Sequence, residues 1–290
     1  MSKILNADEI KQRLILLQKK YSRSRFQEWT LGLDAALFRI SLLYREKGVL
    51  IDLGGGISAH NGILAQLGMT VNVLDLLGSY WDNRASNPEP IDQEIRVLKS
   101  CGVQFINVDL LTCDLTNLFA ENSVDIVTSF HCLEHLHRLP KILLQSAVRI
   151  VKPGGTLVVE VPNAANLRKR LGLLLGHTNY APFQEYSDSP PYLYHIREYT
   201  VGDLSQLAQT IAATENYQIF GRNFHRGPWA ERIPPSMRKL GDLVLQAFPG
   251  LCGSLFLQIT KSATGIKEER ASAVFSGCRQ QPGLKPTPPM

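Results

Sequence analysis

The sequence predicts an α/β fold built on an open, mainly parallel sheet. From Gly48 onward, short apolar runs alternate with helical stretches over about 115 residues, as in a chain of strand–helix units. Runs such as 49–53 and 124–130 are apolar with little polar alternation, which is typical of parallel strands that are buried on both faces. Three glycines at 54–56 directly follow the first run and indicate a tight turn into a helix.

The order of apolar runs and helical periods gives seven strands. We predict strands over 49–53, 70–76, 103–110, 124–130 and 156–162, and two late strands over 217–224 and 253–261. Helices are predicted over 59–67, 91–100, 139–151, 166–175 and 201–213. Pro153 and Gly154 precede the fifth strand and fit the centre of a type II turn, whose second central residue needs a positive φ.

The remaining sequence divides into a cap, an insert and a tail. Residues 1–47 form a predicted helical N-terminal cap, because apolar residues recur every three or four positions. Residues 48–263 form the main domain, and the aromatic, loop-rich insert 164–201 is predicted to be a lid. Residues 264–290 are rich in Pro, Gly and Ser and are predicted to be a disordered tail.

Composition excludes several classes of protein. Of the 290 residues, 44% are hydrophobic and 20% are charged, an ordinary globular balance. The longest apolar runs are about six residues, whereas a membrane span needs about 20. We therefore expect no transmembrane segment, and the N-terminus lacks the apolar core of a secretory signal. A net charge of +5 does not indicate a nucleic-acid partner, and five scattered cysteines are typical of reduced thiols in a cytoplasmic protein.

The glycine turn carries the strongest local chemical signal. Asp52 ends the first strand, and Gly54, Gly55 and Gly56 lead into the next helix. Glycines let a ligand approach the backbone closely, and a helix N-terminus offers free N–H groups to it. The spacing from Gly54 to Ala59 also fits a dinucleotide fingerprint, so the turn alone leaves both a nucleotide site and a ligand-free turn open.

Two further acids end the next strands. Asp75 lies about 20 residues beyond the glycines, where a carboxylate can accept both hydroxyls of a ribose. Asp109 ends the third predicted strand, where it would meet an exocyclic amine. Asp75 could instead be a helix N-cap or a turn residue, and Asp109 alone is ambiguous because acids often follow strands.

Five landmarks in order resemble the class I S-adenosylmethionine-dependent methyltransferases. They are the DLGGGIS turn after the first strand, Asp75, Asp109, the LEH triplet at 133–135, and the KPGG turn at 152–155. The resemblance is close over about 48–163 and looser to 261. It implies a Rossmann-like seven-stranded sheet of order 3-2-1-4-5-7-6, with the last strand antiparallel.

The resemblance also implies roles for individual residues. It assigns Asp52, Gly54, Gly55 and Gly56 to the methionine part of S-adenosylmethionine, and Asp75 to the ribose. It further places Asp109 at the adenine amine, Leu110 on the adenine ring, and Phe130 and His131 near the sulfonium. One departure is Ser58, which stands where the family usually has the third glycine of the loop.

The second half of the sequence narrows the class of acceptor that we expect. Residues 195–209 resemble a segment of small-molecule methyltransferases that are associated with glycan and polysaccharide assembly. This resemblance implies methyl transfer to a small-molecule or glycan-related acceptor, with O-methylation expected and S-adenosylhomocysteine as the product. A proton acceptor would then be a histidine, since its pKa lies near neutral pH. The candidates for that role are His131, His135 and His195, and the candidates for acceptor binding are Tyr194, His195 and Arg197.

Basic residues in 216–240 suggest one kind of acceptor. Such a patch would meet the phosphate of a lipid- or nucleotide-linked sugar and bring the protein into peripheral contact with it. The alternative is ordinary solubilising charge.

Three rival interpretations use the same residues. The sequence from His131 to His135 matches the H-x-x-E-H pattern of some zinc hydrolases, but it lacks an evident third ligand, so we expect no metal. A nicotinamide-dependent oxidoreductase would share the glycine turn, but not the acid at Asp52 or the KPGG turn. A third alternative is a non-catalytic protein that retains the fold and binds the cofactor or a partner.

Overall fold

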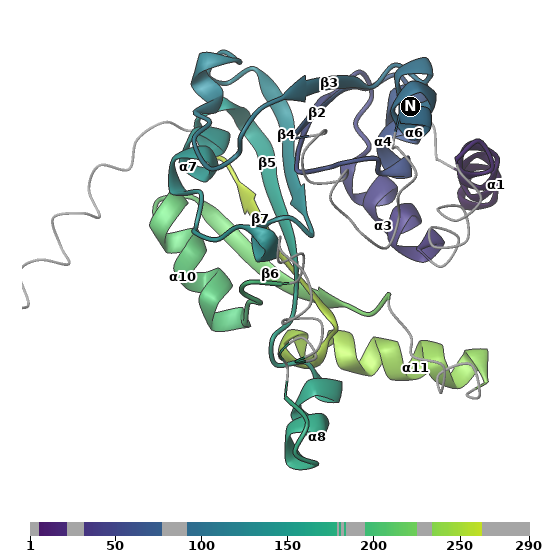
Figure 1. The fold of residues 1–290 in the computed structure, drawn as a ribbon, viewed down its shortest axis with the longest axis vertical. Helices are drawn as coiled ribbons and strands as arrows, with labels where there is room; N and C mark the ends of the chain where they lie inside the picture. The colour runs from purple at the N-terminus through teal and green to yellow at the C-terminus, as the bar shows by residue number, and fades with distance from the viewer. Residues whose placement is uncertain are drawn as a thin grey trace, which may run out of the picture.

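The computed structural model describes residues 6–21, 32–76, 92–178, 180, 183, 195–224 and 234–262. They form one seven-stranded sheet of order β3-β2-β1-β4-β5-β7-β6 (Figure 1). The strands β1 to β5 run parallel, and β7 lies antiparallel between β5 and β6. The predicted strand order and the antiparallel last strand are confirmed. The strands are β1 Val49–Leu53, β2 Thr70–Asp75, β3 Gln104–Asn107, β4 Val124–Phe130, β5 Val151–Pro162, β6 Asn216–Arg222 and β7 Ser254–Thr260.

The strand limits differ most from the prediction at β5, which begins at Val151 rather than at residue 156. The KPGG segment therefore belongs to the strand, and the pairing register with β4 shifts between Val124 and Ile126 to accommodate it. Gly154 has φ +80°, as the predicted turn requires. The third strand is shorter than expected, because β3 ends at Asn107 and Asp109 lies beyond it.

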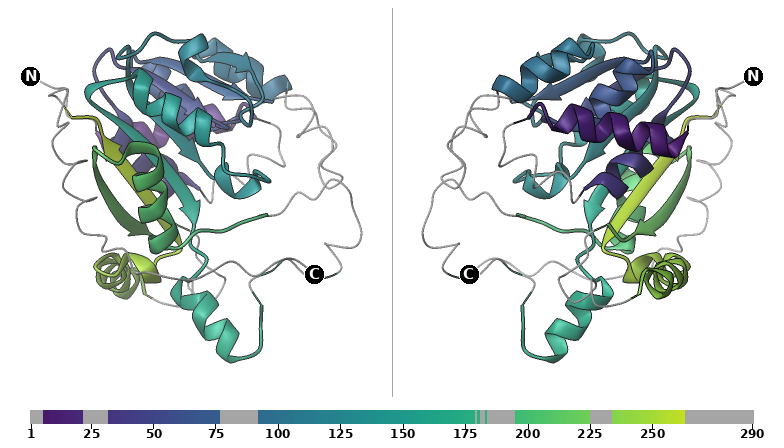
Figure 2. Two further views of the ribbon diagram at one scale, coloured as in Figure 1. Left: turned by 90° about the vertical axis from the view of Figure 1, so that its left-hand side faces the viewer. Right: turned by 90° about the vertical axis from the view of Figure 1, so that its right-hand side faces the viewer.

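Helices cover both faces of the sheet and make a three-layer structure. One layer contains α1 (Ala7–Gln18), α3 (Leu33–Leu43), α4 (Ala59–Gln66) and α6 (Asp92–Ser100). The other contains α7 (Lys141–Ile150) and α10 (Val201–Ala212), and Figure 2 shows the two layers from opposite sides.

Residues that are adjacent in a strand face opposite layers. In β1, Leu50 packs with the α1–α3–α4 side and Ile51 with the α7–α10 side, and both are fully buried. The apolar runs therefore belong to strands that are covered on both faces, as the sequence predicted.

The N-terminal helices contribute to this core rather than lying loosely on it. Ile10, Leu14 and Leu17 of α1 and Ile40 of α3 are buried against the sheet side that contains Leu50. The Tyr21 hydroxyl donates a hydrogen bond to the Ile57 carbonyl, 3.1 Å away, and so ties the end of this segment to the glycine loop.

Two further helices lie at the lower end of the molecule in Figure 1: α8 (Leu167–Leu174) and α11 (Pro235–Gln246). The helix α8 was predicted but α11 was not, and the apolar residues Leu240 and Leu243 of α11 are both exposed. None of the described helices has the length and hydropathy that a bilayer-spanning segment needs. The predicted tail 264–290 and most of the insert between 179 and 194 lie outside the described residues.

Candidate active site

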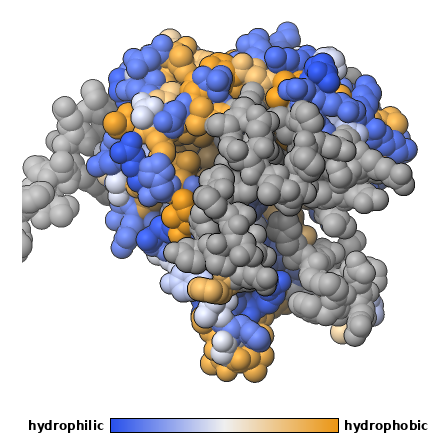
Figure 3. Space-filling view, in the orientation of Figure 1, coloured by the Kyte–Doolittle hydropathy of each residue, from blue (hydrophilic) through white to orange (hydrophobic). Residues whose placement is uncertain are grey.

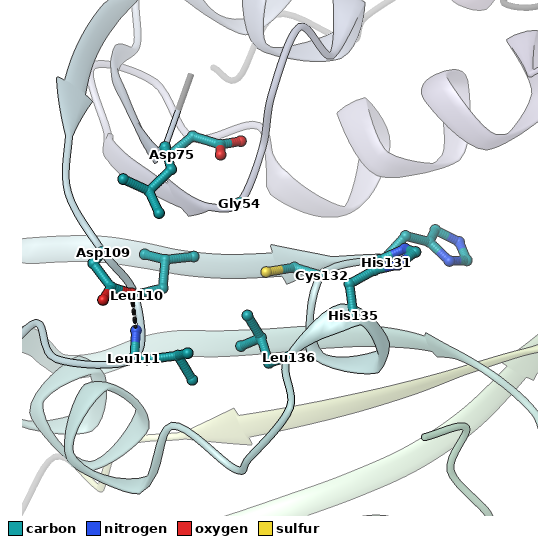
Figure 4. A pocket seen from close by; sticks show the side chains of 10 residues that line it. Gly54, Asp75, Asp109, Leu110, Leu111, His131, Cys132, His135 and Leu136 are labelled. Atoms are coloured by element: carbon teal, nitrogen blue, oxygen red, sulfur yellow. Dashed lines mark hydrogen bonds between the residues drawn. The ribbon is translucent and has the colours of Figure 1, made fainter. Parts of the chain in front are cut away.

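A cavity of about 230 Å³ lies at the carboxyl ends of β1, β2 and β4. This is the edge of an open α/β sheet where ligands bind. Figure 4 shows Gly54 and Asp75 on one side of the cavity, Asp109 at one end, and His131 and His135 at the other. The lining residues are Gly54, Asp75, Leu76, Asp109, Leu110, Leu111, His131, Cys132, His135 and Leu136.

The glycine loop forms one wall, and its backbone requires glycine. Gly54 and Gly56 have φ +68° and +51°, a left-handed conformation that favours glycine. A Cβ atom added to Gly54 would lie 2.3 Å from the Sγ atom of Cys132, so any side chain would fill this part of the cavity. The loop therefore brings bare backbone to the cavity, as a bound ligand would need.

Asp75 connects this loop to the end of β2. Its Oδ2 atom accepts a hydrogen bond from the Gly56 N–H group, 2.9 Å away. Burial raises the pKa of the Asp75 carboxyl to about 6, although N–H groups of Gly56 and Leu76 oppose the shift. The carboxylate is thus held by its backbone partners at the cavity wall and is available to hydroxyl donors.

Asp52 lies beneath the glycine loop. Its carboxylate is fully buried and accepts hydrogen bonds from Asn61 Nδ2 and Thr128 Oγ1, each at 2.7 Å. A Cβ on Gly55 would lie 2.1 Å from Asp52 Oδ2, so the loop backbone passes directly over the carboxylate. Asp52 therefore links β1, α4 and β4 beneath the loop, and it does not line the cavity.

The end of the cavity at Asp109 combines a carboxylate with apolar side chains. Asp109 Oδ1 accepts a hydrogen bond from the Leu111 N–H group, 2.9 Å away, in a turn that fixes the carboxylate beside the cavity (Figure 4). Leu110 is buried and, with Leu111, makes this end apolar. A flat ring with an exocyclic amine would meet both kinds of contact here.

His131 lies between two carboxylates. It follows β4 with φ 49°, which is uncommon for a residue other than glycine. Its Nδ1 atom is 3.1 Å from Glu134 Oε1, and its Nε2 atom is 3.0 Å from Glu160 Oε1. Burial lowers the pKa of His131, but the two carboxylates outweigh burial and raise it to about 9. His131 is therefore a charged, doubly held residue of the cavity wall at neutral pH.

Glu160 extends this network to the N-terminal helices. It is fully buried, and its Oε2 atom accepts a hydrogen bond of 2.8 Å from Arg39 Nε in α3. Burial raises the pKa of Glu160, but Arg39 and His131 outweigh it and hold the pKa at about 2. Sequence reasoning missed both residues. The signal for Glu160 was a single carboxylate inside the otherwise apolar run 156–162, whereas nothing local marks Arg39 as its partner.

His135 and His195 meet although 60 residues separate them in the sequence. Their ring centroids are 5.1 Å apart at an interplanar angle of 72°. The segment that carries His195 is fixed by two backbone bonds, because the N–H groups of Ile196 and Arg197 both reach the Glu134 carbonyl, at 2.7 and 3.2 Å. Two of the three candidate proton acceptors therefore stand together, and the third, His131, faces Glu160 instead.

Other predicted site residues lie away from the cavity. Arg197 is 63% exposed and forms an ion pair with Asp203, 2.7 Å away, at the start of α10. Phe130 is buried beneath the site with the Arg39 guanidinium 4.9 Å from its ring centroid. Gly55, Gly56 and Phe130 do not line the cavity. Tyr194 lies outside the described residues, as do Arg226 and Arg232 of the predicted basic patch.

The zinc-hydrolase interpretation does not fit this geometry. The H-x-x-E-H pattern needs both histidines on one helix face, whereas here His131 follows a strand and His135 ends a short 3-10 helix, Leu133–His135. The premise that this region lacks a third ligand also fails, because Glu134, His135 and His195 each offer a ligand atom, all within 4.8 Å of one another.

Comparison with known proteins agrees with the fold. Residues 51–159 match a methyltransferase domain family. No curated protein gave a significant match.

Solved structures with this fold are distant in sequence. A cyclopropane-fatty-acyl-phospholipid synthase-like protein from Lactobacillus casei is 14% identical, with a TM-score of 0.53 over 86% of this chain and 99% of that one. A methyltransferase from Thermotoga maritima is 12% identical, with a TM-score of 0.50 over 86% and 100%. Phosphoethanolamine N-methyltransferase 2 from Haemonchus contortus, solved with S-adenosylhomocysteine, is 17% identical, with a TM-score of 0.50 over 89% and 61%. Because each of these structures is less than 25% identical to this chain, the similarity shows the fold alone.

The family match covers the glycine loop, Asp75, Asp109 and the LEH triplet, which are the elements that build the cavity. The sheet order 3-2-1-4-5-7-6 is the one that the sequence resemblance implied. Residues 51–159 thus match a methyltransferase domain family, in a chain whose sheet has the order of the class I methyltransferase fold.

Proposed function

We propose that this chain transfers the methyl group of S-adenosylmethionine to a hydroxyl of a small-molecule or glycan-related acceptor. The observation that carries the proposal is a single cavity with donor-type residues, Gly54, Asp75 and Asp109, at one side and a histidine, His135, at the other. A methyl donor and a hydroxyl acceptor need these two kinds of surroundings next to each other.

The donor residues fit S-adenosylmethionine by their chemistry. We assign the ribose hydroxyls to the Asp75 carboxylate, which the Gly56 N–H group already orients, and the methionine part to the loop around Gly54. We assign the adenine to the end formed by Asp109 and Leu110. Asp52 acts beneath the loop as a positioning residue through Asn61. S-adenosylmethionine supplies an activated methyl group on a positively charged sulfur.

The chain's own residues then have two tasks, alignment and removal of a proton. When the acceptor oxygen forms its bond to the methyl carbon, the carbon–sulfur bond breaks, and its electron pair stays on sulfur in S-adenosylhomocysteine. The acceptor proton must leave as well. His131 is unsuited to take it, because both of its ring nitrogens already face carboxylates. We assign the acceptor hydroxyl to the corner formed by His135 and His195, where an imidazole nitrogen of one of these two residues takes the proton.

An exposed apolar surface favours an acceptor that is carried on a lipid. Five leucines of α8 and the residue after it are exposed, and Figure 3 shows them as an apolar tip at the lower end of the molecule. Arg168 and Arg170 on the same helix are also exposed. Apolar side chains bordered by basic residues are typical of contact with an anionic lipid surface. These leucines are Leu167, Leu171, Leu173, Leu174 and Leu175.

The cytoplasmic location remains part of this proposal. Cys101, Cys113, Cys132 and Cys252, the cysteines within the described residues, carry free thiols. Free thiols fit a reducing compartment, in which a lipid-linked acceptor would be reached from the membrane surface.

Incubation with methyl-labelled S-adenosylmethionine tests the proposal. Metabolite and lipid fractions would be supplied separately, and labelled products would be treated with a glycosidase and with base to separate ethers from esters. We expect label in an alkali-stable ether and an equal amount of S-adenosylhomocysteine. Binding of S-adenosylhomocysteine without transfer to any fraction would favour the non-catalytic alternative.

A further inference from the structure

We propose that Glu134, His135 and His195 form a binding site for one divalent transition-metal ion at the acceptor end of the cavity. The three side chains offer a carboxylate oxygen and two imidazole nitrogens, which all lie within 4.8 Å of one another. Two histidines and one carboxylate form a ligand set that suits Zn²⁺ and its neighbours among the first-row metals. This inference rests on the proposed function only for what the ion does there.

The Glu134 carboxylate has one buried oxygen atom that a cation could bind. Glu134 is fully buried, and its Oε1 atom is held by His131 Nδ1, 3.1 Å away. Its Oε2 atom is buried and has no hydrogen-bond partner among the described residues. A buried carboxylate oxygen without a partner is costly, and a metal ion would satisfy it.

His195 is oriented as metal-binding histidines are. Its Nδ1 atom lies 2.9 Å from Glu198 Oε1, and Glu198 in turn pairs with the Lys169 ammonium. Metal-ligating histidines commonly donate one ring N–H to a carboxylate, which fixes the ring and directs the other nitrogen at the metal.

The backbone keeps the three groups together. Glu134 and His135 are neighbours in one short 3-10 helix, and the two N–H groups after His195 bind the Glu134 carbonyl. Ligand atoms around a tetrahedral Zn²⁺ are about 3.3–3.5 Å apart, so a closure of at most about 1.4 Å from the present 4.8 Å would complete the site. His195 is 39% exposed and has room to make this movement.

The proposed metal site borders the cavity, so a bound ion could act on the acceptor. His135 lines the cavity that we assign to the methyl donor. A catalytic metal site keeps a coordination position open, and an acceptor hydroxyl in that position loses its proton to solvent more readily. The deprotonated oxygen then attacks the methyl carbon as the carbon–sulfur bond breaks. This would remove the need for a histidine base.

Titration of the untagged, chelator-treated full chain with Co²⁺ tests the site, because visible absorption reports the ligand set without any enzyme assay. We expect one Co²⁺ per chain, and an affinity at least 100-fold lower in His195→Ala. Glu198→Gln should bind about 10–100-fold more weakly, since it acts only through His195. The matched control is His137→Ala, an exposed histidine two residues beyond the site, which should bind as the wild type does.

Calorimetry with S-adenosylhomocysteine on the same proteins shows whether each variant is folded and keeps the two proposals separate. Donor binding with no Co²⁺ spectrum, or the same Co²⁺ affinity in wild type and Glu198→Gln, would overturn the metal site and leave the methyltransferase proposal intact. A stoichiometric Co²⁺ site without donor binding would overturn the methyltransferase proposal and leave the metal site intact. If His195→Ala fails to fold, the number of Co²⁺ ions bound per wild-type chain and the Co²⁺ affinity of Glu198→Gln test the metal site instead.

Discussion

Replacement of Glu160 by glutamine should destabilise the whole domain. The variant keeps the shape of the side chain but removes the charge that holds Arg39 and His131. Burial raises the pKa of Glu160, yet its two cationic partners hold the pKa at about 2, against an ordinary value of 4.5. Since a tenfold change in an equilibrium constant is about 1.4 kcal/mol, this difference corresponds to about 3 kcal/mol. Loss of one partner from a buried charge network costs a similar amount.

Urea denaturation followed by circular dichroism measures this loss. We expect the free energy of unfolding to fall by about 3 kcal/mol, and the melting temperature to fall by about 6–12 °C for a domain of this size. Because the pKa of Glu160 is lowered, its stabilisation is present above pH 4.5 and is lost as the pH falls towards 2. The difference between variant and wild type should therefore shrink in acid.

The matched control is Glu121→Gln, which removes a surface ion pair with Arg149 of 2.7 Å. Both side chains of this pair are more than half exposed, so the expected change is below about 0.5 kcal/mol. Equal stability of the Glu160 and Glu121 variants would refute the argument that the Arg39–Glu160–His131 network joins the N-terminal helices to the site.

Three further predictions concern the donor loop and the lipid surface. Because burial raises the pKa of Asp75 to about 6, affinity for S-adenosylhomocysteine should fall about tenfold between pH 7 and pH 5, and calorimetry should find a flat profile in Asp75→Asn. Gly54→Ala should abolish donor binding, because the added Cβ would lie 2.3 Å from the Cys132 thiol. The control Gly68→Ala has open space around the added Cβ and should lose only about 1 kcal/mol of stability, because its φ is positive. Unaltered donor binding in Gly54→Ala would contradict the assignment of the loop to the donor. Leu174→Asp should weaken flotation with anionic vesicles at least tenfold, and Leu16→Asp on α1 should not; equal effects of the two changes would remove the lipid proposal.

The fold could be predicted largely from periodicity, because burial on both faces leaves an unbroken apolar run. The run 124–130 gave the limits of β4 without error, and the spacing between the glycines and Asp75 placed the cavity wall. The start of β5 was wrong, because the Pro153–Gly154 turn reads as an interruption in sequence but is accommodated by a shift in strand register. The helix α11 was missed although Met237, Leu240 and Val244 recur at helical spacing.

The site was harder to predict because its chemistry depends on partners that are distant in sequence. Asp52 ends a strand as a ligand-binding acid would, yet its carboxylate turns inward to Asn61 and Thr128. The pairing of His135 with His195 depends on how the chain returns from the insert, which no local pattern encodes. Residue type and spacing therefore singled out Gly54, Asp75 and Asp109, which line the cavity, whereas the meeting of His135 with His195 required the three-dimensional arrangement.

Titration of the full chain with S-adenosylhomocysteine by calorimetry, alongside Asp75→Ala, tests the central claim most directly. The wild type should bind one molecule per chain. The variant should bind at least tenfold more weakly, because it loses charge-assisted hydrogen bonds to the ribose of about 1.5–3 kcal/mol each. Asp125→Ala is the control, since it removes a carboxylate that also accepts a backbone N–H bond, from Val49 at 2.8 Å, but does not line the cavity. Absence of binding in the wild type, or equal affinity in Asp75→Ala and Asp125→Ala, would contradict the assignment of this cavity to the methyl donor.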